Sequence, residues 1–460
     1  MSLIKSISGI RGTIGGIPGE GLSPLDVVRF TSGYAWWLKA NLPAKKLKVV
    51  VGRDARISGE MVNALVCATL SGMGCDVINI GLATTPTTEI AVTGEQADGG
   101  IILTASHNPR QWNALKLLNH RGEFLSAKDG ELVLRYADSE EFVFASVDEL
   151  GKITEKDYTR EHIVKILDLP LVDVEAIRKA NFSIAFDAVN SVGGIALPLL
   201  LQLLGVKRIV PINEEPTGEF AHVPEPLPEN LTETCSLVRN KAVDVCFVVD
   251  PDVDRLSIID QNGSMFNEEY TLVAVADYVL SVTPGNTVSN MSSSRALRVV
   301  TEKYGCSYAA SAVGEVNVVQ KMKETGAVIG GEGNGGVIYP ELHYGRDALV
   351  GIALFLTHLA RSGKKCSELR KTYPDYFISK NKIELTPDVD VDSVLNRIKE
   401  LYRSEEISTI DGVKIDFERE WVHLRKSNTE PIIRIYAESD SMEKASRLAE
   451  KLIKDIQKQI

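Results

Sequence analysis

The chain alternates short apolar runs with amphipathic stretches three times in succession, and this alternation constrains its fold more than any other feature. Residues 47–51 and 76–80 have the pattern of strands on either side of a helix that ends near Gly72, which makes a strand–helix–strand unit. The same order restarts at residues 182–186 and again at 287–289. Strands that alternate with helices are typical of parallel sheets covered by helices, so three consecutive α/β units are predicted.

The first helix shows the local signals behind this prediction. Ser58 is expected to cap a helix that runs to about Gly72. Met61, Leu65 and Ala68 recur at helical spacing, so we expect them on the apolar face of that helix.

The pattern changes after Lys371. Residues 391–401 and 442–456 have helical periodicity, and short alternating runs lie between these two stretches. This order is typical of a small α+β domain with an antiparallel sheet. A chain of 460 residues is too long for one core, so several domains are expected. The predicted domains are 1–150, 151–254, 255–371 and 372–460.

The formal charge of −11 argues against a nucleic-acid partner, which is held through its phosphates by basic residues. A small phosphorylated ligand stays open, because it needs only local positive charge. No apolar run approaches the length of a membrane span, and residues 1–6 lack the apolar core of a signal peptide. We therefore expect a cytoplasmic protein without membrane contact. The sequence leaves both a monomer and a homodimer open.

Six cysteines are scattered along the chain without a C-x-x-C pair. Several have apolar neighbours, as Cys246 has in Val245 and Phe247. They are expected to be buried free thiols, and neither a disulfide framework nor a zinc site is predicted from them.

Ser106 lies in a polar loop, residues 104–109, directly after the apolar run 99–103. Open α/β sheets bind ligands in the loops that follow their strands. The alternative is an ordinary turn that Pro109 enforces. A serine hydrolase is disfavoured, because the chain has no G-x-S-x-G motif here and the neighbouring His107 is poorly placed to activate Ser106.

Asp250, Asp252 and Asp254 alternate in a turn after the apolar run 243–249. Carboxylates clustered in this way repel one another unless a cation joins them, and Mg²⁺ prefers such oxygen ligands. A calcium loop fails on spacing, because Arg255 stands where that loop needs glycine and Gln261 where it needs glutamate. The alternative is a solvated acidic turn.

Two other loops carry anion-binding residue types. The loop at 425–431 contains donors that suit a phosphate, namely Arg425, Ser427, Asn428 and Thr429. Near the N-terminus, Arg11 stands between Gly9 and Gly12, where backbone can approach an anion closely. Each loop taken alone is also compatible with an ordinary turn.

Glu332 and Asn334 lie in the glycine-rich run 330–336. Glycines let a ligand approach the backbone, and a carboxylate with an amide can bind neighbouring sugar hydroxyls. Together with the serine loop, the acidic turn and the phosphate loop, this set favours phosphoryl transfer to and from a sugar phosphate. A magnesium phosphatase and a non-catalytic sugar-phosphate-binding protein are the competing hypotheses.

Four of these stretches, in this order, resemble the motifs of the α-D-phosphohexomutase family, and the resemblance covers essentially the whole chain. The matching stretches are 104–109, like the family's phosphoserine loop, 250–255, like its metal loop, 331–336, like its sugar-binding loop, and 425–431, like its phosphate-binding loop.

The resemblance implies three α/β domains of shared topology and a C-terminal α+β domain around a central active-site cleft. It implies a phosphorylated Ser106 and one Mg²⁺ per chain, held by Asp250, Asp252, Asp254 and an oxygen of that phosphoserine. The phosphoryl group would pass to a hexose monophosphate and give a bisphosphate intermediate, with hexose 1,6-bisphosphate as activator. Substrate would contact Glu332, Asn334 and the phosphate-binding side chains Arg425, Ser427, Asn428, Thr429 and Arg434.

The resemblance also implies a role at the reaction centre for four basic residues, namely Arg11, His107, Lys116 and Arg255. They are expected to stabilise the transferring group, with proton transfer by His107 or Lys116. Many members carry serine and histidine where this chain has Asn334 and Gly336, so a histidine given a proton-transfer role in some relatives is missing. His343 is near in sequence, with nothing in the sequence to place it at the site.

The Glu-x-Asn-Gly-Gly form of the sugar-binding loop is similar to that of phosphoglucosamine mutases. We therefore expect conversion of glucosamine 6-phosphate to glucosamine 1-phosphate. Phosphomannomutase/phosphoglucomutase activity is the alternative, because Glu332 would bind ring hydroxyls that these sugars share.

Overall fold

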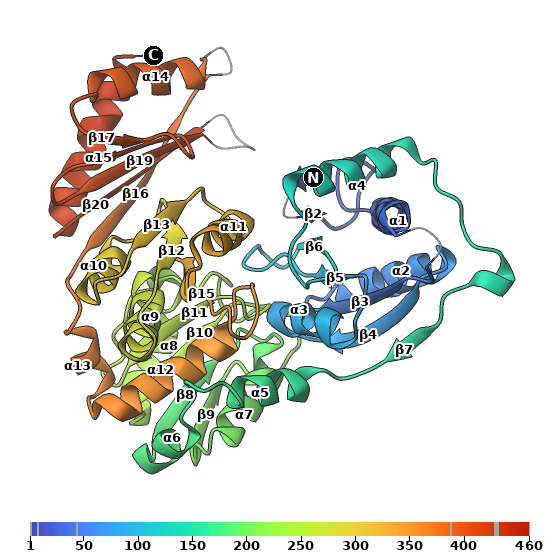
Figure 1. Ribbon diagram of the computed structural model, residues 1–460, viewed down its shortest axis with the longest axis horizontal. Coiled ribbons are helices and arrows are strands. Elements are labelled where there is room, and N and C mark those ends of the chain that lie inside the picture. Colours follow the sequence, from blue (N-terminus) through green and yellow to red (C-terminus); the bar gives the residue numbers. More distant parts are fainter. Residues whose placement is uncertain (1, 7–8, 43–44, 387–388, 427–431, 460) are drawn as a thin grey trace. The chain divides into compact units, whose positions relative to one another are not determined.

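The computed structural model describes residues 2–6, 9–42, 45–386, 389–426 and 432–459, which form two compact units (Figure 1). The first unit comprises Met1–Thr271 and Gly335–Leu369, and the second comprises Leu272–Asn334 and Arg370–Ile460. Serine, asparagine and threonine at positions 427–429 of the predicted phosphate-binding loop lie outside the described residues.

The first sheet has seven strands in the order β1-β2-β6-β5-β3-β4-β7. In chain order they are β1 (Leu3–Ser6), β2 (Gly9–Thr13), β3 (Lys48–Arg53), β4 (Asp76–Leu82), β5 (Gly99–Leu103), β6 (Trp112–Leu118) and β7 (Ile153–Glu155). β3 runs parallel to β4 and β5, whereas β6 is antiparallel to β5. The accompanying helices are α1 (Pro24–Asn41), α2 (Gly59–Gly72), α3 (Thr85–Gly94) and α4 (Ala127–Ser139). Helices α5 (Thr159–Leu167) and α6 (Val174–Ala180) follow in the chain and both contact α12 (Ala348–Ser362). The parallel strands thus end at one edge, where β3 and β5 present their following loops.

Helix α1 begins with a complete capping box. The hydroxyl of Ser23 accepts from the Asp26 amide, and the Asp26 carboxylate accepts from the Ser23 amide. Pro24 occupies the first turn, where no amide hydrogen is needed. The buried face includes Phe30 and Tyr34, so α1 packs into the core of the first sheet.

Helix α2 corrects the prediction made for its N-terminus. Its range agrees, but the Ser58 backbone is helical and its side chain caps no amide. Instead, the Ser58 hydroxyl accepts a hydrogen bond from the Asn113 amide group at 3.0 Å. The predicted apolar face was also wrong, because Met61 is exposed and the buried face runs through Val62, Val66 and Leu70.

The second sheet repeats the central order of the first. Its strands are β8 (Ser183–Asp187), β9 (Arg208–Ile212), β10 (Val245–Val249) and β11 (Leu256–Asp260), in the order β11-β10-β8-β9. β8 is parallel to β9 and β10, and β11 is antiparallel to β10. Helices α7 (Gly193–Leu203), α8 (Thr232–Lys241) and α12 belong to this part of the first unit. The short β15 (Gly336–Ile338) is the edge strand of the third sheet, in the order β13-β12-β14-β15. The topology shared by successive α/β domains is therefore present.

The second unit holds a third parallel arrangement and the C-terminal domain. β12 (Thr287–Asn290) lies between β13 (Tyr308–Ser311) and β14 (Ile329–Glu332), parallel to both. Helices α10 (Ala296–Lys303) and α11 (Glu315–Thr325) connect these strands, while α9 (Glu269–Val282) and α13 (Cys366–Arg370) cross the division between the units. β12 therefore repeats the central position that β3 and β8 hold in the first two sheets.

The C-terminal domain has an antiparallel five-stranded sheet, red in Figure 1, in the order β16-β20-β19-β18-β17. Its elements are β16 (Phe377–Glu384), α14 (Val391–Leu401), β17 (Glu406–Ser408), β18 (Val413–Asp416), β19 (Trp421–Lys426), β20 (Ile432–Ser439) and α15 (Met442–Gln457). α15 packs on β20 and β16. The predicted α+β domain is confirmed.

Glu438 joins the C-terminal sheet to the third parallel arrangement within the second unit. Its side chain is fully buried and accepts from the Arg295 backbone amide at 3.1 Å and from the Trp421 indole at 2.6 Å. A buried carboxylate satisfied by donors from two domains holds them in contact, because leaving it unpaired would be costly.

All six cysteines are described, and all are free thiols. Four of them are buried, as expected from their apolar neighbours. Burial raises the pKa of the Cys67 thiol to about 12, so this group stays a neutral thiol at neutral pH.

At the end of β8, buried Asp187 accepts hydrogen bonds from His222 Nε2 at 3.2 Å and from the Thr234 hydroxyl at 2.7 Å. Burial lowers the pKa of His222, but the hydrogen bond and charge of Asp187 outweigh it and raise the pKa above 6.5. Burial likewise raises the pKa of Asp187, but His222 and Thr234 more than offset it and hold the pKa below 3.8.

His222→Gln is therefore expected to lower the free energy of unfolding by about 1.5 kcal/mol at pH 5 to 6. The ion pair contributes fully between the two unfolded pKa values, about 3.8 and 6.5. Its contribution falls as pH rises through the raised pKa of His222, and also as pH falls through the lowered pKa of Asp187. Urea unfolding from pH 4 to 9 measures this, with exposed His120→Gln as control. A deficit in His222→Gln that stayed constant up to pH 9 would contradict the pairing.

Candidate active site

The acidic triad is buried directly after β10, in the first unit. Asp250, Asp252 and Asp254 are all fully buried, and one carboxylate oxygen from each lies within 4.8 Å of the others. The turn is fixed by the Asp254 and Arg255 amides, which donate to Asp250 Oδ1 at 3.2 and 3.1 Å. Val253, between Asp252 and Asp254, has a left-handed φ of 62°. A strained backbone here brings three carboxylates to one point.

Two basic side chains offset only part of this negative charge. Lys116 Nζ lies 2.7 Å from Asp252 Oδ2 and 3.7 Å from Asp254 Oδ2, and Arg346 donates to Asp254 Oδ2 at 2.7 Å. Burial and the charges of Asp254 and Asp252 raise the pKa of Asp250 well above its usual range. Burial opposes ionisation of Asp252 too, but Lys116 and Thr85 hold its pKa below the usual range.

A hard divalent cation fits this donor set. Asp252 Oδ1 and Asp254 Oδ1 are buried and accept no hydrogen bond from any described residue. Unpaired buried carboxylate oxygens are costly, and Mg²⁺ coordinates such oxygens. The three residues predicted to bind magnesium are therefore placed to do so.

Ser106 lies beside this triad, in the loop after β5. Its hydroxyl donates to Asp250 Oδ2 at 2.6 Å, although the two residues are 144 positions apart. Its φ is 48°, a left-handed value that is uncommon for residues other than glycine. The Ser106 amide donates to the Thr104 hydroxyl at 2.9 Å, and that hydroxyl donates to Asp54 at 2.6 Å. The loop therefore holds Ser106 in an otherwise unfavourable conformation with its hydroxyl at the triad.

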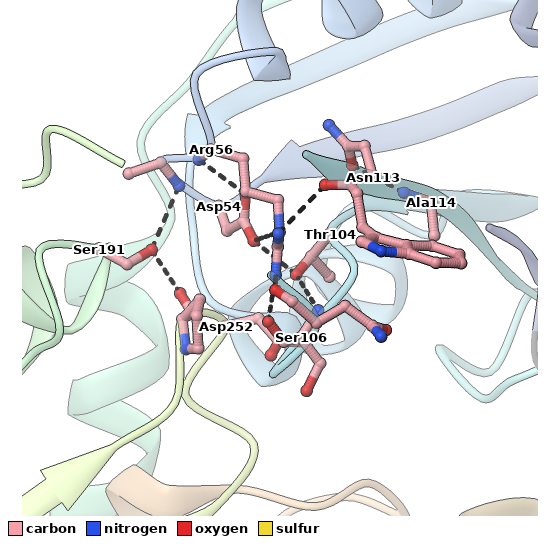
Figure 2. Close-up of polar contacts among 12 residues, drawn as sticks. Asp54, Arg56, Thr104, Ser106, Asn113, Ala114, Ser191 and Asp252 are labelled. Atoms are coloured by element: carbon pink, nitrogen blue, oxygen red, sulfur yellow. Dashed lines mark hydrogen bonds and ion pairs between the residues drawn. The ribbon is translucent and has the colours of Figure 1, made fainter. Parts of the chain in front are cut away.

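Arg56 holds this loop through its guanidinium, and Figure 2 shows Arg56 together with Asp54, Thr104 and Ser106. It is 1% exposed, and all five of its guanidinium hydrogens have acceptors. Nε donates to Asp54 at 3.0 Å, and the two terminal nitrogens donate to the backbone carbonyls of Ser106, Asn108, Pro109 and Trp112. Arg56 therefore ties the backbone of Ser106 and of the residues that follow it to the stretch after β3.

Sequence reasoning gave no role to Arg56 or Asp54, although a signal was present. The stretch 52–56 follows β3, whose carboxyl end lies beside that of β5 in the sheet. Charged residues after adjacent parallel strands meet at one edge, so this stretch was a candidate neighbour of the Ser106 loop.

The four basic residues predicted at the reaction centre all belong to the first unit. His107 Nδ1 lies 3.4 Å from Ser106 Oγ, and burial together with the charge of Arg255 lowers the pKa of His107 to about 2. Arg11 lies on β2, where burial and the charge of Arg255 lower its pKa. Arg255 Nη1 lies 3.3 Å from Glu225. The charge of Arg255 thus acts on both Arg11 and His107, and His107 lies next to Ser106.

The predicted sugar-binding residues belong to the second unit. Glu332 ends β14, is buried, and accepts from Asn290 Nδ2 at 2.7 Å and from the Gly314 amide at 3.1 Å. The Gly333 amide donates to the Ser293 hydroxyl at 2.9 Å, which fixes the start of the glycine-rich loop. Asn334 follows in this loop and is partly exposed.

Arg425 and Arg434 lie directly opposite each other on β19 and β20, in the same unit. Arg425 Nε pairs with Asp411 at 3.1 Å, and Arg434 is exposed. The pair therefore concentrates positive charge at one point of the sheet, and Asp411 offsets part of it.

The whole chain matches the family models of phosphoglucomutase/phosphomannomutase. The three α/β/α domains match residues 4–144, 160–263 and 267–376, and the C-terminal domain matches 382–455. A "Phosphoglucomutase/phosphomannomutase" of Thermococcus kodakarensis is 37% identical over 96% of this chain and 97% of its own. The chain belongs to the phosphoglucomutase/phosphomannomutase family. It is a phosphohexomutase, an isomerase, as the four motifs implied.

Other relatives of this phosphohexomutase carry amino-sugar names. A "Phosphoglucosamine/phosphogalactosamine mutase" of Sulfurisphaera tokodaii is 32% identical over 99% of this chain and 100% of its own. A crystal structure of a phosphoglucomutase/phosphomannomutase family protein from Burkholderia thailandensis is 25% identical, with a TM-score of 0.85 over 99% of this chain and 97% of that one. The fold thus agrees with the family along nearly the full length.

Within the described part of this phosphohexomutase, no helix is both long and apolar enough to cross a membrane.

Asp252→Asn tests the metal loop. The change keeps the size of the side chain but removes one of the negative charges that face the cation. The Mg²⁺ concentration for half-maximal turnover is expected to rise at least about tenfold. Exposed Asp244→Asn, just before β10, is the matched control in the same titration. An unchanged midpoint in Asp252→Asn would remove this carboxylate from the metal site.

Proposed function

We propose that this phosphohexomutase interconverts a hexose 6-phosphate and a hexose 1-phosphate through a phosphorylated Ser106. The observation that carries the proposal is the 2.6 Å contact between the Ser106 hydroxyl and Asp250 of the acidic triad. A phosphoryl group on Ser106 would stand next to that triad. Mg²⁺ bound by Asp250, Asp252, Asp254 and an oxygen of the phosphoserine would supply positive charge that offsets the phosphoryl oxygens.

In the first transfer, the Oγ–P bond of phosphoserine breaks and a bond forms between phosphorus and a free hydroxyl of the hexose monophosphate. The hexose hydroxyl gives up its proton, and Ser106 Oγ takes one as it leaves phosphorus, so that the serine ends as a hydroxyl. Neutral His107, whose Nδ1 lies 3.4 Å from Ser106 Oγ, is placed beside this oxygen. The bisphosphate intermediate then reorients in the site, and its other phosphoryl group passes to Ser106. Lys116, Arg11 and Arg255 stabilise the charge on the transferring group. Free hexose 1,6-bisphosphate would activate the enzyme by phosphorylating Ser106.

A mutase must also hold the phosphate that does not react. The facing pair Arg425 and Arg434 supports this role, with Ser427, Asn428 and Thr429 proposed as further phosphate donors. A phosphatase would use water as the phosphoryl acceptor and would need no second phosphate-binding site. A binding protein would need neither Ser106 nor the triad.

We propose glucosamine 6-phosphate as the preferred substrate. Glu332 is buried, and Glu315, which follows the Gly314 amide bound to Glu332, is buried as well. Two buried carboxylates in one region favour a cationic amino group over a neutral hydroxyl. The amino-sugar name of the Sulfurisphaera tokodaii relative agrees with this preference.

Glucose and mannose phosphates are the second candidates. They are supported by the name of the Thermococcus kodakarensis relative, which is 37% identical.

Parallel turnover assays on glucosamine, glucose and mannose 6-phosphates, with Mg²⁺ and a bisphosphate primer, test both substrate proposals. The highest kcat/KM is expected for the amino sugar. Glu315→Gln should lower kcat/KM for glucosamine 6-phosphate about tenfold, the effect of losing one charged hydrogen bond, and change the glucose value little. Exposed Glu324→Gln on the same helix is the control. Equal or higher kcat/KM on the neutral sugars would reassign the substrate, and release of phosphate instead of isomer would reject the mutase mechanism.

A further inference from the structure

Three side chains that take no part in the proposed reaction converge on one point in the first unit. Nε2 of His162, on α5, lies 3.0 Å from Oδ2 of Asp347, and Nε2 of His343 lies 3.4 Å from the same oxygen. One ligand atom of each residue lies within 4.8 Å of those of the others. We propose that His162, His343 and Asp347 form a structural site for a divalent transition metal ion, Zn²⁺ in the first place, separate from the magnesium site.

The spacing and the donor types suit zinc. With metal–ligand bonds of about 2.0–2.1 Å, neighbouring ligands of a tetrahedral ion are roughly 3.3 Å apart. The two observed nitrogen–oxygen separations, 3.0 and 3.4 Å, lie close to this value. The imidazole rings are nearly perpendicular, at 88°, so they approach the carboxylate from two directions. Two imidazole nitrogens with one carboxylate suit Zn²⁺, whereas Mg²⁺ prefers oxygen ligands alone.

Each proposed ligand is oriented by a second contact on its far side. His162 Nδ1 lies 2.9 Å from the Thr87 hydroxyl, and His343 Nδ1 lies 3.2 Å from Glu89 Oε2. Oδ1 of Asp347 accepts from the first amides of α12, at 2.8 and 3.3 Å, which leaves Oδ2 for the two histidines. Imidazoles that bind metal through one nitrogen usually donate a hydrogen bond from the other. His162 has this arrangement through the Thr87 hydroxyl, and His343 has the Glu89 carboxylate within ion-pair distance of Nδ1.

The negative charge of the cluster also favours a bound cation. Asp347 and Glu89 are both buried, which places two carboxylates out of contact with water. One dication with two neutral imidazoles would balance them. The other solution is two imidazolium groups whose Nε2 hydrogens share the single oxygen Oδ2, which places two positive charges close together.

The cluster is closed rather than open to a substrate. A Cβ atom at Gly345 would lie 1.8 Å from Glu89 Oε2 and 2.8 Å from His343 Cε1, so backbone packs directly against these groups. A metal here would tie α3, α5 and the start of α12 together. It would also fix Asp347, whose neighbour Arg346 donates to Asp254 of the acidic triad at 2.7 Å. Its role is therefore structural, and it does not depend on the proposed function.

Elemental analysis of the full-length protein tests the proposal. The protein is produced in zinc-supplemented medium and dialysed against excess Mg²⁺, which competes for the acidic triad. One zinc per chain is expected in the wild type and in Asp252→Asn, and none in His162→Gln. His222→Gln is the matched control, because His222 also pairs with a buried aspartate but has no second histidine on that oxygen. Glu89→Gln should weaken zinc affinity about 10- to 100-fold.

Cobalt gives a readout that needs no variant. Chelator-treated wild type in saturating Mg²⁺ is titrated with Co²⁺, and the intense visible bands of tetrahedral cobalt with imidazole ligands are expected. Wild type that holds no zinc and shows no such bands would overturn the proposal and leave a protonated histidine cluster. Zinc retained by folded His162→Gln, or lost by Asp252→Asn, would overturn it too by placing the metal elsewhere.

Discussion

Ser106→Ala is expected to abolish mutase turnover, with kcat lowered on the order of 10⁴-fold or more, as in other enzymes that lose their nucleophile. The hydroxyl is the proposed phosphoryl carrier. Its two neighbours, His107 at 3.4 Å and the Asp250 carboxylate that accepts its hydrogen bond, do not replace it in this role. The measurement is turnover with a bisphosphate primer, together with transfer of labelled phosphate from hexose bisphosphate to the protein. Both are expected to vanish together.

The control is exposed Ser139→Ala, at the end of α4, which should keep wild-type turnover and labelling. Circular dichroism shows whether Ser106→Ala stays folded, which is expected because the change removes only an oxygen and leaves the Arg56 contacts to the backbone. Labelled protein from Ser106→Ala would place the phosphoryl carrier on another residue. Wild-type turnover without labelling would reject a phosphoenzyme altogether.

Much of the fold followed from local pattern, because apolar runs such as β3 and amphipathic helices such as α14 are recognisable from the sequence. Helices α9 and α12 were not foreseen. Nearly every side chain of α12 up to Leu359 is buried, so its sequence has no polar face and no helical period to detect. Helix α4 was not foreseen either, because its sequence looks polar and the helix is stabilised by tertiary packing of Val133 and Ala137.

The part of the site that the sequence predicted consists of loops that directly follow strands. Ser106 and the triad each follow a buried strand, so each was expected at the carboxyl edge of a sheet. Because β5 and β10 belong to different sheets, the meeting of the two loops did not follow from local pattern. The histidine cluster could not be foreseen in this way. His162 and Asp347 are 185 positions apart, one within a helix and the other at a helix start. Their meeting depends on how α12 packs against α5, which no local pattern specifies.

Arg56→Lys is expected to lower both stability and turnover, although Arg56 does not reach the triad. Lysine has three donors on one nitrogen and cannot span the four carbonyls and Asp54 that the planar guanidinium joins. Buried acceptors would lose their partners, so the free energy of unfolding should fall by about 3 kcal/mol. The loop would also lose the contacts that hold Ser106 at its left-handed φ.

The kinetic signature separates positioning from binding. A nucleophile displaced by about 1 Å costs roughly 10²-fold in rate, so kcat should fall by about that factor while KM for hexose phosphate changes little. Arg53→Lys is the matched control, since Arg53 ends the same strand but its side chain makes polar contacts, among the described residues, only with the adjacent Asp54 carbonyl, at 3.2 Å, and with exposed Glu60, at 3.6 Å. A rise in KM without a loss of kcat would mean that Arg56 acts on substrate binding. Wild-type stability and kcat in Arg56→Lys would mean that the loop holds Ser106 without this clamp, through the contacts of Thr104 and Asp54 alone.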